Sequence, residues 1–150
     1  MIKNDRQRQI TQEEIRKFEE AIANLPDFAT LDNEDDRHFW QIQNDALHSM
    51  LGDLRAQLTD YEQLRTGRLQ AVSLDSLPQL AEALIAARIA SGLTQRQLAE
   101  RLGLKEQQIQ RYEATDYQSA SLARITEVAS ALRIEVRGEI GLPGAATRAA

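Results

Sequence analysis

The spacing of small and apolar residues over residues 94–112 constrains the fold more than any other feature of the chain. Apolar residues recur at helical spacing on both sides of a glycine: Leu98, Leu102, Leu104, Ile109 and Tyr112. Ala99 is small where a second helix must cross the first, and Gly103 suits a left-handed turn between two helices. This pattern predicts two short helices that pack at a steep angle, as in a helix-turn-helix.

Start and stop signals divide the C-terminal half into four short helices. Ser76 and Pro78 mark the start of the first, and Thr94 with Gln97 forms a capping box before the second. The predicted helices span residues 78–90, 95–102, 106–114 and 122–132, and either Ser119 or Ser121 caps the last one. After them, apolar residues alternate with polar ones and hint at a short C-terminal strand: Ile134, Val136 and Ile140.

The N-terminal half predicts a pair of antiparallel helices. Thr11 and Glu14 fit a capping box at the start of the first helix. Its apolar stripe ends before Pro26 and consists of Ile15, Phe18, Ile22 and Leu25. Residues 31–36 are predicted to form an acidic loop. A second helix, from about 36 to 64, carries a coiled-coil-like seam of Trp40, Asn44, Leu47, Leu51, Leu54, Leu58 and Tyr61. One hairpin buries little apolar area, so we expect it to dimerise or to bind a partner.

The expected architecture is therefore all-α. It comprises a helical hairpin (1–66), a linker (67–77), a helix-turn-helix domain (78–140) and a flexible tail (141–150), with a short strand in the linker at residues 71–74. The net charge of −5 is uneven, because residues 1–66 carry 14 acidic and 8 basic side chains. Residues 86–111 instead carry 5 basic and 2 acidic side chains. Such asymmetry between the halves of a chain is a reason to consider them separately.

Several functions have no support in the sequence. The chain has no cysteine, which excludes disulfides and thiolate metal sites. His38 and His48 do not cluster on one helix face, and residues 32–36 lack the central glycine of a calcium loop. No catalytic triad, phosphate-binding glycine loop or zinc motif appears, so we expect no enzyme activity, metal or cofactor. The polar N-terminus and the lack of a long apolar run predict a cytoplasmic protein without membrane contact.

Residues 84–132 resemble the Xre family of lambda-repressor-like DNA-binding domains. The resemblance rests on Arg88, Gly92, Leu93, Thr94, Gln95, Leu98, Ala99, Gly103, Ile109, Tyr112 and Glu113. It implies a bundle of four or five helices, a homodimer and a palindromic double-stranded DNA operator. It also implies that Arg88 and Glu113 form a structural ion pair between the first and third helices of the domain. Lys105 departs from the family pattern, which has a Ser or Thr cap at this place.

The docking geometry of the motif gives the candidate DNA-binding residues. The start of the recognition helix would face base edges with Glu106, Gln107, Gln108 and Arg111. Gln can bond adenine and Arg guanine, whereas Glu106 would accept a hydrogen bond from cytosine or repel a phosphate. As the resemblance implies, Gln95 would bond a phosphate and brace the recognition helix. Further phosphate contacts are expected from Arg96, Lys105 and Ser119.

The main interpretation is a transcriptional repressor whose acidic hairpin also neutralises a basic protein toxin, as in HigA-like antitoxins. One alternative is a stand-alone Xre-type regulator whose N-terminal helices only dimerise. Another is a protein-interaction module in which the two short helices form an αα-corner without DNA binding.

Overall fold

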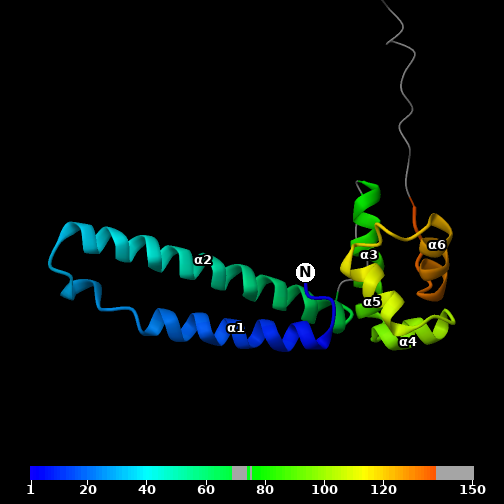
Figure 1. Ribbon diagram of the computed structural model, residues 1–150, viewed down its shortest axis with the longest axis horizontal. Helices are drawn as coiled ribbons and strands as arrows, with labels where there is room; N and C mark the ends of the chain where they lie inside the picture. Colours follow the sequence, from blue (N-terminus) through cyan, green and yellow to red (C-terminus); the bar gives the residue numbers. More distant parts are fainter. Residues whose placement is uncertain (69–73, 75, 138–150) are drawn as a thin grey trace, which may run out of the picture.

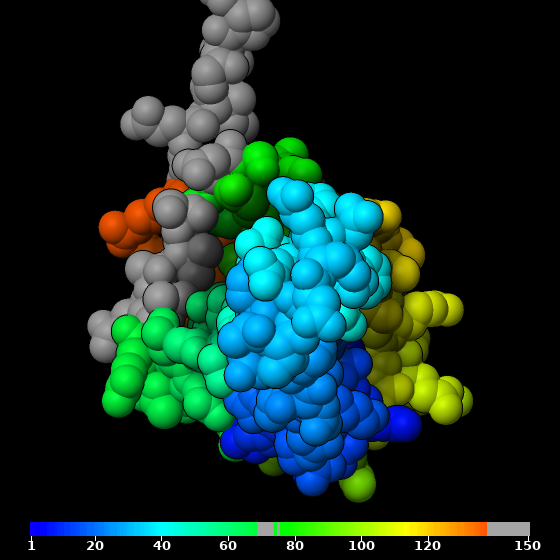
Figure 2. Space-filling view, turned by 90° about the vertical axis from the view of Figure 1, so that its left-hand side faces the viewer, coloured from blue at the N-terminus to red at the C-terminus, as the bar shows by residue number. Residues whose placement is uncertain are grey.

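The computed structural model describes residues 1–68, 74 and 76–137, and this part of the chain contains helices but no strand. A long hairpin of α1 (Asp5–Ala23) and α2 (Glu34–Arg65) projects from a bundle of shorter helices (Figure 1). The bundle comprises α3 (Leu77–Ala90), α4 (Gln95–Arg101), α5 (Glu106–Ala114) and α6 (Leu122–Ala131). Seen along the hairpin, the turn between α1 and α2 stands in front of the bundle (Figure 2). The all-α expectation is confirmed.

The predicted strands are not found where the structure describes the chain. Ile134 and Val136 belong to irregular backbone after α6, so the prediction of a strand there was wrong for these two residues. Ile140, the tail (141–150) and most of the proposed strand at 71–74 lie outside the described residues. The same holds for most of the proposed linker, 67–77, whose last residue is the first of α3.

Helix α1 begins several residues earlier than the capping box at Thr11 predicted. The N-cap is Asn4, whose side-chain oxygen accepts a hydrogen bond from the Gln7 N–H at 2.9 Å. Thr11 lies inside the helix and is 8% exposed. Because a Thr followed by a Glu three residues later also occurs inside helices, the better cap at Asn4 determines the start.

The predicted acidic loop is partly helical. Asn33 caps α2 and accepts a hydrogen bond from the Asp36 N–H at 2.7 Å. Glu34, Asp35 and Asp36 therefore form the first turn of α2, where the helix dipole stabilises negative charge. A short 3-10 helix, Phe28–Thr30, completes the turn between α1 and α2.

The predicted seam of α2 faces α1. Leu51 and Tyr61 are buried, and the other seam residues are partly buried: Trp40, Asn44, Leu47, Leu54 and Leu58. At the far end of the hairpin, the Trp40 ring packs edge-on against Phe28, with ring centroids 5.1 Å apart. The Trp40 indole N–H also donates to the Pro26 carbonyl at 2.8 Å. These contacts close the turn.

The base of the hairpin contributes to the core of the bundle. Ile2, which is 3% exposed, belongs to the same buried cluster as residues of the hairpin and of the bundle. This cluster includes Tyr61 and Leu64 of α2, Leu84, Ile85 and Ile89 of α3, Leu98 of α4, Ile109 of α5 and Val128 of α6. The start of the chain is thereby fixed against the bundle.

Candidate nucleic-acid interface

Helices α4 and α5 form the pair predicted from residues 94–112. Thr94 and Gln97 make the predicted capping box: the Thr94 hydroxyl accepts from the Gln97 N–H at 3.1 Å, and the Gln97 side chain accepts from the Thr94 N–H at 2.9 Å. Gly103 has a φ of +65°, which an L side chain rarely adopts. Ala99 is 1% exposed and belongs to the buried core cluster, as expected for a small residue at a place where helices pack closely.

The start of α5 separates the predicted base-contacting residues into two groups. The Lys105 side chain makes no cap hydrogen bond, and the Lys105 N–H donates instead to the Gln108 side-chain oxygen at 3.0 Å. Gln108 is therefore partly buried and satisfies a backbone donor at its own helix terminus. Gln107 and Arg111 are exposed on α5, and Glu106 is exposed but accepts a hydrogen bond from the Gln110 amide at 3.1 Å.

The predicted phosphate-contacting residues also differ in their surroundings. Gln95 is partly buried, and its amide donates to the Glu113 carboxylate at 2.8 Å, which ties α4 to α5. Arg96 is exposed, and its hydrogen bond to Glu100 raises the pKa of the guanidinium, which stays charged. Lys105 is exposed.

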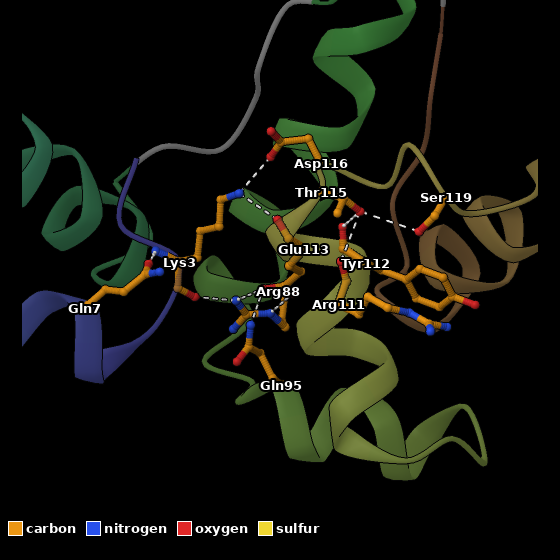
Figure 3. Close-up of polar contacts among 10 residues, drawn as sticks. All are labelled: Lys3, Gln7, Arg88, Gln95, Arg111, Tyr112, Glu113, Thr115, Asp116 and Ser119. Carbon is orange, nitrogen blue, oxygen red and sulfur yellow. Dashed lines mark hydrogen bonds and ion pairs between the residues drawn. The ribbon is translucent and has the colours of Figure 1, made fainter.

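Of the two serines predicted as alternative N-caps of α6, Ser121 is the cap and Ser119 is not. Ser121 is the N-cap of α6 and accepts a hydrogen bond from the Arg124 N–H at 3.2 Å. Ser119 is exposed in the turn before α6, and its hydroxyl lies 3.5 Å from that of Thr115 (Figure 3). Ser119 therefore stays available as a surface hydroxyl beside the end of α5.

A buried ion pair joins α3 to α5 (Figure 3). The side chains of Arg88 and Glu113 are 3% and 1% exposed, and the two share a bidentate contact with a nitrogen–oxygen distance of 2.8 Å in one arm. Arg88 also donates to the carbonyls of Leu93, at 2.8 Å, and Lys3, at 2.5 Å. Because the guanidinium donates to the Glu113 carboxylate and to two backbone carbonyls, this pair fixes the position of α5 in the bundle.

A third residue contacts both members of this ion pair and was not predicted from the sequence: Lys3. Its ammonium donates to the Glu113 carbonyl at 2.6 Å and pairs with Asp116 at 2.8 Å (Figure 3). A cation at this place stabilises the last carbonyls of α5. Lys3 and Glu113 are 110 residues apart in sequence, so no local pattern could have linked them.

The turn after α5 depends on two residues with positive φ, Asp116 and Tyr117. The Tyr117 ring is buried and stacks on Tyr112, with ring centroids 5.9 Å apart. Burial raises the pKa of the Tyr117 hydroxyl above its ordinary value, so the hydroxyl is neutral at neutral pH. The turn after α5 is thus held by the buried, uncharged Tyr117 side chain.

The two packed helices, the left-handed glycine between them and the exposed start of α5 have the geometry of a helix-turn-helix. A helix-turn-helix family model matches residues 84–138, so this part of the chain is similar to helix-turn-helix domains. The hairpin lies outside that match. No curated protein and no solved structure matches the chain. Within residues 1–68 and 76–137, no helix is long and apolar enough to cross a membrane.

Proposed function

We propose that the protein is a sequence-specific transcriptional repressor that binds a palindromic operator as a homodimer. The observation that carries this proposal is the exposed start of α5 on a helix-turn-helix domain. In the major groove, Gln107 can bond adenine, Arg111 can bond guanine, and Glu106 can accept from cytosine. Around them, Arg96, Lys105 and Ser119 are exposed and suit phosphate contacts, whereas Gln95 and Gln108 act mainly by holding α4 and α5 in place.

Selection of binding sites from random double-stranded DNA tests the proposal. Full-length protein is expected to select a palindrome whose half-sites lie about 10 base pairs apart. Gln107→Ala should then lose about 1–3 kcal/mol of discrimination at one base pair in each half-site, because one bidentate base contact disappears. Competition binding against single-base variants of the operator measures this loss.

Lys105→Ala provides the contrast for the same experiment. It removes one exposed charge from each protomer of the dimer, so affinity should fall for all DNA sequences and the salt slope should decrease by about one unit per protomer, about two in total. Base preference should stay as in the wild type. A Gln107→Ala protein with the full base preference of the wild type would show that α5 does not dock in this way.

A second candidate function concerns the hairpin, for which we infer a protein partner of basic charge. Exposed apolar residues follow one another at helical spacing on the outer side of α2: Phe39 (66% exposed), Ile42 (56%), Ala46 and Met50 (53%). Large apolar side chains gathered on a surface are typical of an interaction site. Residues 9–66 carry 13 acidic and 5 basic side chains, which favours a basic partner over a second copy. Such a partner would fit the role of a HigA-like antitoxin toward a toxin.

The double substitution Phe39→Ser and Ile42→Ser tests the hairpin. On co-expression with the products of neighbouring genes, the wild type is expected to co-purify with a basic protein, and the variant should lose it while still binding operator DNA. Val136→Ser, which changes another half-exposed apolar residue outside the hairpin, should retain the partner. If the double variant changes from dimer to monomer by light scattering instead, the stripe is a dimer interface and the stand-alone regulator is the better description.

A further inference from the structure

The charge of the N-terminal half reverses along the hairpin. Residues 1–8 contain Lys3, Arg6 and Arg8 but only one carboxylate, Asp5, whereas the rest of this half is strongly acidic. Figure 1 places the start of α1 beside the bundle and the turn between α1 and α2 at the opposite end. The basic end of the hairpin therefore lies next to the helix-turn-helix.

A cleft of about 700 Å³ separates this basic end from α4 and α5. The start of α1 forms one wall, which includes Arg6 and Gln7. The opposite wall includes Gln95 of α4 and one flank of α5, formed by Glu106, Gln110 and Ala114. The recognition helix thus has a second element of the chain facing one of its sides.

Most cations that line the cleft already have partners. Lys3 pairs with Asp116, and Arg88 pairs with Glu113. Arg65 pairs with Asp5 at 2.6 Å and thereby neutralises the carboxylate at the start of α1. Arg6 is exposed, and no carboxylate of residues 1–68 or 76–137 lies within ion-pair distance of it. Its charge is available to an external anion.

We propose that this cleft takes up the phosphate backbone of one operator strand and that Arg6 contacts a phosphate there. The inference rests on the proposed docking of α5 in the major groove. That groove is about 12 Å wide and a helix with its side chains measures about 10–12 Å, so sugar-phosphate backbones run directly along both flanks of the helix. On the flank with Gln110 and Ala114, the backbone passes between α5 and Arg6.

The substitution Arg6→Gln in the full-length protein tests this contact. One phosphate contact is lost in each half-site, two in the dimer, so the affinity for the selected operator should fall about thirtyfold at 0.15 M salt and the salt slope should decrease by about 1.8. Nonspecific duplex DNA should show the same reduction, because phosphates carry no sequence information. Arg16→Gln is the matched control: it removes an exposed arginine of the same helix, further from the bundle, and should bind as the wild type does.

The outcomes separate this inference from the proposed function. If the wild type selects no DNA sequence, DNA binding by α5 itself is wrong. If the wild type binds its operator and Arg6→Gln binds equally well with the same salt slope, the function stands and the contact is wrong. Ethylation interference provides a second measurement: one phosphate beside each half-site should matter for the wild type and for Arg16→Gln but not for Arg6→Gln. Urea unfolding checks that both variants are folded.

Discussion

Arg88→Met is expected to lower the free energy of unfolding by about 3–5 kcal/mol, the usual cost of removing one partner from a buried ion pair. Methionine fills much of the space of the aliphatic part of arginine, so the loss is mainly electrostatic. The Glu113 carboxylate keeps only the hydrogen bond from Gln95, and the carbonyls of Lys3 and Leu93 lose a donor. Urea denaturation of the full-length protein measures the change.

Arg96→Met is the control for that measurement. The Arg96–Glu100 pair is exposed on α4, and removing such a pair costs about 0–1 kcal/mol. Adding Glu113→Leu to Arg88→Met should recover part of the stability, because an unpaired buried charge then no longer exists. Equal losses in Arg88→Met and Arg96→Met would mean that the buried pair does not stabilise the bundle as described.

The second large effect is expected at the start of the chain. Ile2→Ala should lower the free energy of unfolding by about 2–5 kcal/mol, because Ile2 is 3% exposed and its truncation leaves a cavity in the shared core. Ile10→Ala makes the same chemical change at a residue that is 49% exposed, and it should change stability by about 0.5 kcal/mol or less.

The same experiment reports whether hairpin and bundle unfold together. Trp40 is the only tryptophan of the chain and lies near the turn of the hairpin, so its fluorescence follows the far end of that element. Far-UV circular dichroism follows all helices. Coincident transitions are expected, because the core at the base of the hairpin belongs to both parts. If Ile2→Ala is no more destabilising than Ile10→Ala, the shared core is not formed.

The helices of the bundle could be predicted closely because their signals are local. A cap or a glycine bounds each one, as Thr94 and Gly103 do for α4. The seam of α2 could also be predicted from the sequence, since its residues repeat at helical spacing within one element. Gln108 shows a signal that was present but not used: it stands three residues after the N-cap Lys105, the place from which a glutamine reaches back to the cap backbone.

Contacts between distant parts of the chain could not be predicted in this way. The burial of Ile2, the position of Lys3 at the end of α5 and the cleft beside Arg6 all depend on how the hairpin meets the bundle. No residue spacing within either half of the chain predicts the contact between the hairpin and the bundle. The basic cluster in residues 1–8 was visible in the sequence, but its meaning depends on its place next to α5.

The length of the hairpin resolves an apparent conflict between an acidic protein and a nucleic acid ligand. Helix α2 has 32 residues and is therefore about 48 Å long. Ions in a cell-like solution screen charges over about 8 Å, so carboxylates near the turn are several screening lengths away from anything held by α5. The DNA then experiences the local charge of the bundle and of the start of α1, and the overall charge of −5 does not oppose binding.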